Sequence, residues 1–160
     1  MILSSQPAKR CHTVCAWAVD QDRVLLVRHK KLGMWLAPGG HVEENELPHH
    51  AAIREFKEET GLDCTILSPN NSFVSESTEY LPLPVFCNLH TINKLRGDGF
   101  CEQHYAWGYA VRVQGDTAPT LADDGVTDIA WVKREDLSTY PLTSEILQEA
   151  LFMLNHFSSL

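Results

Sequence analysis

The chain lacks any long apolar segment and any excess of positive charge. No run of about 18 apolar residues, the length that a membrane-spanning helix needs, occurs in its 160 residues. Residues 1–10 have no apolar core behind a basic start, so we expect no signal peptide, no membrane partner and a cytoplasmic location. The formal net charge of -8 argues against a nucleic-acid polymer as partner, because that binding depends on Lys and Arg.

The sequence also lacks recognisable cysteine and histidine motifs. Its five cysteines are odd in number and include no C-x-x-C pair, so they indicate neither a disulfide framework nor a structural zinc site. We interpret them as idle thiols of a reducing compartment. The histidines show no metal-ligand spacing, and only His104 stands out, because it follows a loop that is a candidate for substrate binding. The cysteines are Cys11, Cys15, Cys64, Cys87 and Cys101.

The length is that of one domain, 1–160, and no internal repeat divides it. Two β-branched runs, 14–19 and 24–27, flank a polar turn and predict a hairpin. A helix is expected over 46–60, with Asn45 as its N-cap and Gly61 as its C-cap. Further strands are expected over 64–67, 85–92, 105–113 and 129–132, a last amphipathic helix over 142–154, and loops over 68–84 and 93–102. Strands flanked by helices predict a layered α/β or α+β domain.

Three glutamates of the first expected helix share one face. A helix turns by about 100° per residue, so Glu55, Glu58 and Glu59 fall within an arc of about 100°. Like charges at this spacing destabilise a helix, and the C-terminal end of the helix dipole also disfavours anions. Such a triplet taken alone is most often a solvated charged face. The alternative is a bound cation, and hard carboxylate oxygens suit Mg²⁺ or Mn²⁺, which bridge protein carboxylates to substrate phosphates.

The residues around the triplet decide between these interpretations. They follow the pattern Gly40-x5-Glu46-x7-Arg54-Glu55-Phe56-Lys57-Glu58-Glu59-Thr60-Gly61-Leu62. This resembles the Nudix box, G-x5-E-x7-R-E-U-x-E-E-x-G-U with U a bulky apolar residue, at every specified position. At average residue frequencies, a chance match has a probability on the order of one in ten million. The preceding Trp35-Leu36-Ala37-Pro38-Gly39-Gly40-His41 is similar to the loop that leads into that box.

The resemblance to the Nudix family implies an α/β/α sandwich around a mixed β-sheet. It also implies metal ligation by Glu55, Glu58, Glu59 and the backbone carbonyl of Gly39, with Mg²⁺ or Mn²⁺ as cofactor. Glu46 and Arg54 are expected to be structural. The family uses a variable general base, for which we favour Glu58. Glu59 completes the catalytic pair that we predict, and the alternative bases, on the expected loops, are Glu76, Glu79 and Glu102.

The implied function is hydrolysis of a phosphoanhydride bond in a small nucleotide, such as a nucleoside triphosphate or a nucleoside-diphosphate-linked compound. In the basic run 28–31, Arg28 is our predicted phosphate contact, although a solvated strand end is the commoner role for such a run. Trp35 is predicted to stack on a base, with His104 as a further substrate contact. Tyr105, Trp107 and Tyr109 are alternative stacking residues, but their alternation is more typical of a core strand.

Two other functions stay open at this point. Some Nudix-like domains are non-catalytic nucleotide sensors, but a sensor has no need to keep all three glutamates. Isomerisation of an isoprenoid diphosphate would use elements for which this short chain has little room. A homodimer is compatible with the family, and the sequence contains nothing that decides the oligomeric state.

Overall fold

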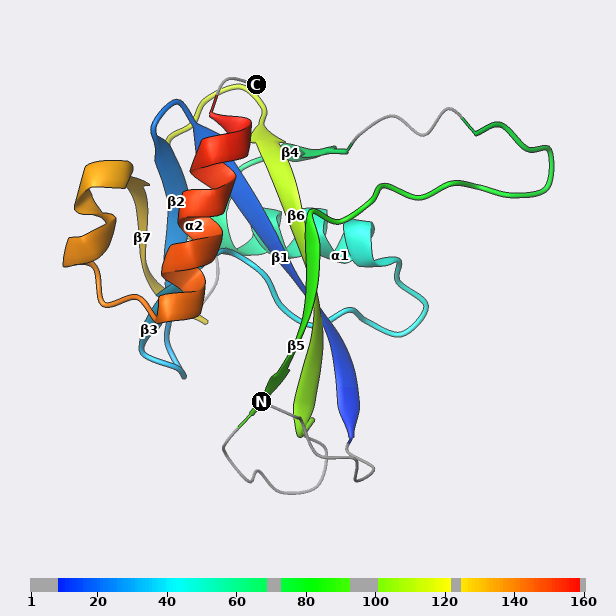
Figure 1. Cartoon of the computed structure of the whole chain (residues 1–160), viewed down its shortest axis with the longest axis horizontal. Helices are drawn as coiled ribbons and strands as arrows, with labels where there is room; N and C mark the ends of the chain where they lie inside the picture. The colour runs from blue at the N-terminus through cyan, green and yellow to red at the C-terminus, as the bar shows by residue number, and fades with distance from the viewer. Residues whose placement is uncertain (1–8, 69–72, 93–100, 122–124, 159–160) are drawn as a thin grey trace.

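A computed structural model describes residues 9–68, 73–92, 101–121 and 125–158. In these residues seven strands form one mixed sheet in the order β3-β2-β1-β6-β4, with β5 on β6 and β7 on β2 (Figure 1). The elements in chain order are β1 (Arg10–Asp20), β2 (Arg23–His29), β3 (Met34–Leu36), α1 (Pro48–Thr60), β4 (Cys64–Leu67), β5 (Phe86–Thr91), β6 (Gln103–Val113), β7 (Val126–Lys133), η1 (Arg134–Thr139) and α2 (Ser144–Phe157). No helix among the described residues is both long and apolar enough to span a bilayer.

The centre of the sheet is the parallel pair β1 and β6. Their register runs from Arg10 opposite Gln103 to Ala18 opposite Val111. The far end of β1 turns back into β2, with Val19 opposite Val24, and Gln21 takes a positive φ of 54° in the turn. This confirms the predicted hairpin and makes the sheet mixed.

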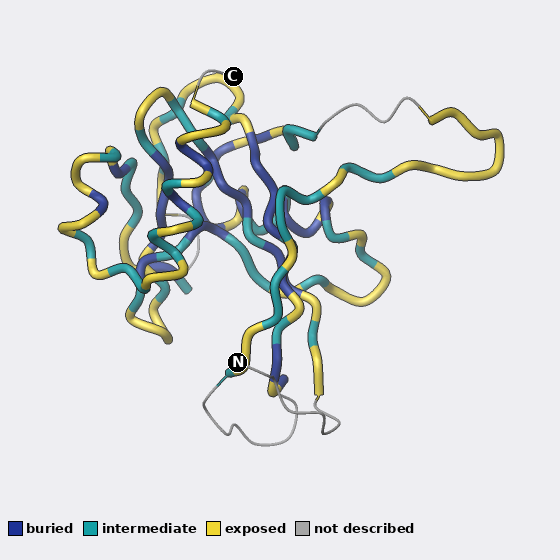
Figure 2. The backbone as a smooth tube through the Cα atoms, viewed as in Figure 1, coloured by how far each residue is buried: buried dark blue, intermediate teal, exposed yellow. Residues whose placement is uncertain are grey.

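The two helices cover opposite faces of this sheet (Figure 1). Successive side chains of a strand point to opposite faces, and β1 follows this rule. Val14, Ala16 and Ala18 belong to the core beneath α1, together with Phe56. Trp17 belongs to the second core, which includes Ala150, Met153 and Leu154 of α2. The predicted α/β/α sandwich is therefore confirmed, and Figure 2 shows the buried positions concentrated in the layers.

The start of the glutamate helix differs from the prediction. Helix α1 begins at Pro48, not Glu46, and its N-cap is Leu47, which provides no side-chain cap. Asn45 instead has a positive φ of 66° and lies in the preceding turn. Proline fits the first helical position because its missing N–H has no partner there in any helix. The predicted end is confirmed, since Gly61 has a φ of 72° and its N–H donates to the carbonyl of Lys57.

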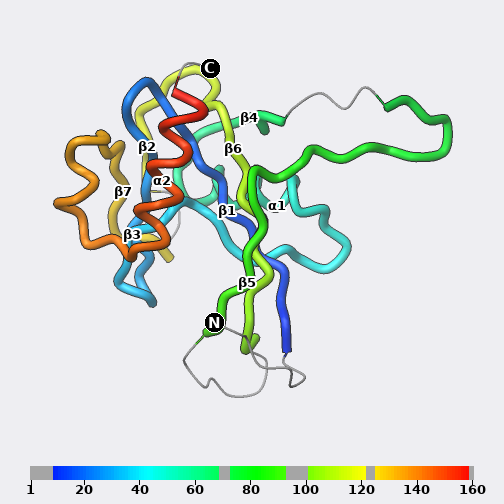
Figure 3. Tube along the Cα trace, viewed as in Figure 1, coloured from blue at the N-terminus to red at the C-terminus, as the bar shows by residue number. Residues whose placement is uncertain are grey.

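Most strand predictions are confirmed with shifted ends. The predicted strand 64–67 coincides with β4, whereas β6 and β7 begin earlier than expected. Strand β3 and the short helix η1 were missed, because three residues of strand and six of 3-10 helix carry too little periodicity. Residues 73–84 contain no helix or strand and project from the layers (Figure 3). Of the expected loop 93–102, residues 93–100 lie outside the described residues.

The prediction of idle cysteines is wrong for two of the five. Cys11 and Cys101 form a disulfide with their Cα atoms 5.6 Å apart. They lie 90 residues apart in the sequence and meet only because β1 and β6 are paired side by side. Spacing along the chain therefore could not reveal the pair. Cys15, Cys64 and Cys87 are free thiols.

The packing of α1 generates a first prediction. Phe56 is fully buried in the core beneath α1, so Phe56→Ala should reduce the free energy of unfolding by about 3–5 kcal/mol. Phe152 of α2 is 43% exposed, and Phe152→Ala should cost less than about 1 kcal/mol. Urea unfolding followed by circular dichroism measures both. Equal losses would contradict the assignment of Phe56 to the core.

Candidate active site

The three glutamates of α1 differ sharply in exposure. The Glu59 residue is 5% exposed, whereas the side chains of Glu55 and Glu58 are 16% and 52% exposed. Because Phe56 and the alanines of α1 pack on the sheet, the carboxylates lie along the flank of the helix. The set therefore runs from a buried carboxylate to one that reaches solvent.

Arg54 links these carboxylates to the turn before the helix. Its Nε and Nη2 donate to the two oxygens of Glu46, each at 2.8 Å. Its Nη1 donates to Glu55 at 2.9 Å and to Glu58 at 3.1 Å. The planar guanidinium allows this because it presents five donors in a fixed arrangement. One cation therefore contacts three carboxylates, and the predicted link between Glu46 and Arg54 is confirmed.

The loop before the helix, residues 37–41, lies between β1 and the glutamates. The carbonyls of Pro38 and Gly40 accept from Ala16 and Val14 of β1, and the Gly39 N–H donates to Glu59 at 2.9 Å. In an extended segment the N–H and C=O of one residue point to the same side. If Gly39 is extended, its carbonyl lies on the same side as its N–H, and its role as a metal ligand stays a prediction.

Both glycines of this loop permit close approach. A Cβ on Gly39 would lie 2.1 Å from the carbonyl oxygen of Val14, and one on Gly40 would lie 2.4 Å from a carboxylate oxygen of Glu55. Any larger residue would displace either β1 or the carboxylate. The glycine pair thus brings the backbone against the acidic face.

The pKa values of Glu46 and Glu55 are shifted in opposite directions. Hydrogen bonds from Arg54 lower the pKa of Glu46. Burial raises the pKa of Glu55, and Arg54 only partly opposes this. The same neighbours raise the pKa of Arg54, chiefly through Glu46. Glu46 is thus the satisfied partner of the arginine, whereas Glu55 carries a charge that burial disfavours.

Comparison with known proteins gives the same family. The model of the NUDIX domain matches residues 9–150 of this chain. The chain belongs to the Nudix family. A solved Nudix hydrolase from Clostridium perfringens is 31% identical with a TM-score of 0.77, and the alignment covers 91% of this chain and 97% of that one.

Two curated Nudix relatives carry named activities. A dihydroneopterin triphosphate diphosphatase from Haemophilus influenzae is 27% identical over 145 residues, which are 88% of this chain and 86% of that protein. An 8-oxo-dGTP diphosphatase from Proteus vulgaris is 34% identical over 67 residues, 37% of this chain and 60% of that protein. The match thus spans less than two thirds of the second relative, and these names describe those proteins alone.

The three predicted substrate contacts lie in different settings. Arg28 is exposed on β2, opposite Trp35 and Asp128. Trp35 is 7% exposed, and its ring packs edge-on against Tyr140 at 5.1 Å, so it serves the core in this conformation. His104 lies on β6 opposite Cys11. The binding roles of Arg28, Trp35 and His104 stay predictions.

A surface pocket lies beside the Nudix box, and the sequence did not single out most of its lining. Its lining includes Arg10, His12, Trp107 and Glu46. Glu55, Glu58 and Glu59 do not line it. The Trp107 indole donates to His12 at 3.3 Å and stacks on it. These residues come from neighbouring strands, so only the β1–β6 pairing could have identified them.

Sequence reasoning also missed a group of histidines. The ring of His104 contacts those of His41 and His90, with centroids 4.9 and 5.5 Å away. Burial and the two neighbouring rings lower the pKa of His104 to about 4. In this conformation the ring of His104 is therefore neutral near pH 7.

The Arg54 contacts generate a second prediction. Arg54→Met should reduce the free energy of unfolding at pH 7 by about 2 kcal/mol, because the hydrogen bonds to charged partners are lost. The lowered pKa of Glu46 contributes stability above its ordinary value of 4.5, and this contribution disappears as the pH falls through the lower folded value. The deficit of Arg54→Met should therefore shrink below pH 4.5, as urea unfolding across pH will measure.

Arg134→Met is the matched control, since Arg134 pairs with Asp22 at an exposed position. Its cost should stay below about 1 kcal/mol. A deficit of Arg54→Met that is no larger than that of the control, or that does not change with pH, would contradict the role given to Arg54.

Proposed function

We propose that the chain is a divalent-metal-dependent hydrolase that cleaves a phosphoanhydride bond in a small nucleotide. The observation that carries this proposal is the complete carboxylate set on α1, arranged around Arg54 and against the glycine pair. A domain that only sensed a nucleotide would have no need for three carboxylates at this density. The Nudix family and its hydrolase relatives support the same reaction class.

The residues fit a hard divalent cation. Glu55, Glu58 and Glu59 would hold it with the Gly39 carbonyl, since Mg²⁺ and Mn²⁺ prefer oxygen ligands. The close approach of Gly40 to Glu55 and the hydrogen bond from the Gly39 N–H to Glu59 support this, because they place the glycine backbone next to two of the carboxylates. When bound, Mg²⁺ or Mn²⁺ would neutralise phosphate charge and lower the pKa of water.

Glu59, Glu58 and Arg54 have different proposed roles. Glu59 is buried and held by the Gly39 N–H, so it has the fixed position that a ligand requires. Glu58 is the most exposed of the three and meets solvent, so it is the proposed acceptor of the proton from water. Arg54 holds Glu58 and Glu55 in place and limits their mutual repulsion.

The substrate class follows from the relatives that the chain resembles. Their names include 8-oxo-dGTP and dihydroneopterin triphosphate, so a triphosphate on a purine or pterin is the substrate we propose. Arg28 remains the proposed phosphate contact. Trp35 and His104 remain proposed contacts that would need local rearrangement, given the packing of Trp35 against Tyr140 and the neutral ring of His104.

A third prediction tests this activity. The purified chain with Mg²⁺ or Mn²⁺ should turn over at least one member of a panel of nucleoside triphosphates, oxidised nucleotides, pterin triphosphates and nucleoside-diphosphate sugars. A triphosphate should release diphosphate or phosphate, and a nucleoside-diphosphate sugar should give a nucleoside monophosphate and a sugar phosphate. Glu59→Gln should lower kcat by at least about 100-fold, since it removes a charged ligand. Chelation should abolish turnover and added Mg²⁺ should restore it. Mass spectrometry of products formed in ¹⁸O-water locates the attacked phosphorus.

Glu135→Gln is the control, because Glu135 is an exposed residue of η1 paired only loosely with Lys133. Its kcat should equal that of the wild type. Tight nucleotide binding without product would support the sensor instead. Absence of turnover on the whole panel by folded protein would refute the hydrolase.

A further inference from the structure

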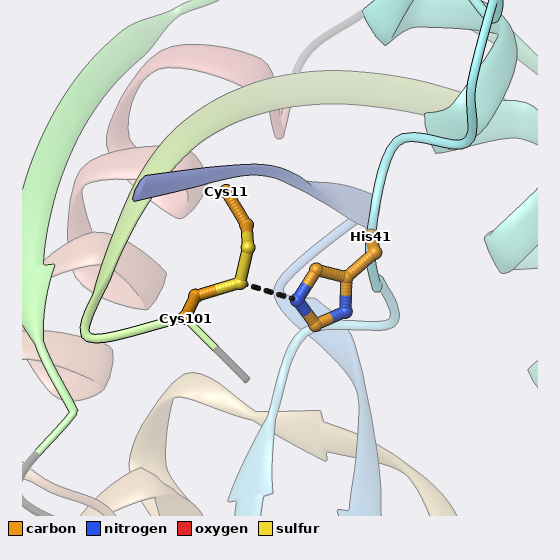
Figure 4. A group of neighbouring side chains, drawn as sticks. All are labelled: Cys11, His41 and Cys101. Atoms are coloured by element: carbon orange, nitrogen blue, oxygen red, sulfur yellow. Dashed lines mark hydrogen bonds between the residues drawn. A yellow bond between two sulfur atoms is a disulfide. The ribbon is translucent and has the colours of Figure 1, made fainter. Parts of the chain in front are cut away.

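Two cysteines and one histidine meet beside the Nudix box, outside the glutamate face. Cys11 lies at the start of β1, Cys101 two residues before β6, and His41 at the end of the glycine loop (Figure 4). Their three ligand atoms lie within 4.8 Å of one another. The His41 Nε2 points to the sulfur of Cys101 at 3.7 Å. None of the three lies on α1.

The fold holds these residues in place from several sides. Parallel pairing of β1 with β6 places Cys11 opposite His104 and brings the chain before β6 alongside it. Strand β1 also holds His41 through an antiparallel bridge to Thr13. The carbonyl of His41 accepts from Arg54 Nη2 at 3.0 Å. The site is therefore anchored to β1 and is linked to the arginine of the box.

We propose that Cys11, Cys101 and His41 form a binding site for a thiophilic divalent cation, with Zn²⁺ as the representative ion, when the two sulfurs are reduced. Two sulfurs and one imidazole nitrogen are ligands that Zn²⁺ accepts in proteins. This set contrasts with the oxygen ligands of the glutamate face. The two sites thus differ in the class of metal that they select.

The observed spacing suits tetrahedral coordination. With Zn–S near 2.3 Å and Zn–N near 2.0–2.1 Å, a sulfur and a nitrogen on one ion lie about 3.6 Å apart, and two sulfurs about 3.8 Å. The distance of 3.7 Å between His41 Nε2 and the sulfur of Cys101 agrees with the first value. The two sulfurs have to separate, which reduction of the disulfide permits. Three protein ligands leave the fourth position to water.

The neighbouring ring supports His41 as a ligand. His104 lies edge-on to His41, with ring centroids 4.9 Å apart and planes at 87°. This contact limits rotation of the His41 imidazole and favours the orientation that directs Nε2 at the sulfurs. Fixed ligand orientation is what neighbouring residues commonly provide to a metal site.

The disulfide and the metal site are alternative states of the same residues. A dithiol reductant transfers two electrons and two protons to the Cys11–Cys101 bond and is itself oxidised to a disulfide. The two thiols then lose their protons as Zn²⁺ binds the thiolates. The oxidised state has no thiolate to offer and leaves only His41. Metal binding at this site therefore requires reduced protein.

A fourth prediction tests this site with Co²⁺ and Zn²⁺ as probes. The full chain, reduced with dithiothreitol and desalted without oxygen, should bind one Co²⁺ with a thiolate-to-cobalt charge-transfer band, and Zn²⁺ should abolish the band. Oxygen ligands cannot produce this band, so cobalt on the glutamates does not interfere. Cys101→Ser and His41→Ala should each weaken binding at least tenfold. Circular dichroism confirms that the variants are folded.

The matched control is Cys87→Ser, which removes an exposed free thiol and should leave the band unchanged. Wild-type protein oxidised to the disulfide, as verified by peptide mass, should show no band. A reduced wild type without a charge-transfer band overturns the proposal. So does a band that survives unchanged in both Cys101→Ser and His41→Ala. Loss of hydrolase activity would leave this readout unaffected, so the two proposals fail separately.

Discussion

The arrangement of this molecule depends on offsetting three carboxylates on one face of a short helix. Carboxylates at this spacing repel one another, and the end of the helix where they lie adds a further unfavourable field. Arg54 supplies one positive charge to Glu46, Glu55 and Glu58 together. A single guanidinium leaves the set strongly negative, and Glu55 is also partly buried. The remaining negative charge is the physical basis for proposing that this face binds a multivalent cation.

Strand β1 positions the face of α1 that carries Glu55, Glu58 and Glu59. β1 forms the parallel pair with β6, turns into β2, and receives the glycine loop on its N-terminal half. The same loop gives the Gly39 N–H to Glu59 and carries His41 toward Cys101. The same loop, residues 37–41, therefore contacts both the glutamates of α1 and the Cys11–Cys101 pair. The Cys11–Cys101 bond lies beside His41, which follows the glycine pair in the sequence.

The local sequence pattern predicted most of the turns, strands and helix ends. The hairpin turn, β4 and the Gly61 cap follow from turn residues, β-branched runs and a glycine, which tolerates the left-handed conformation, and the Nudix box located the carboxylates. The helix start failed because Asn45 and Glu46 suit a cap as well as a turn, and Pro48 decided the outcome. The Cys11–Cys101 pair and the histidine group were not predicted, for another reason. They depend on strand neighbours separated by many residues, which no spacing along the chain encodes.

The claim that α1 carries a catalytic cation site is tested most directly by diffraction from crystals soaked with Mn²⁺, using its anomalous signal. We expect a peak in contact with Glu59, at least one of Glu55 and Glu58, and the Gly39 carbonyl, and no such peak in Glu59→Gln crystals. Anomalous peaks found only away from these residues, in crystals whose glutamate face is open to solvent, would contradict the account.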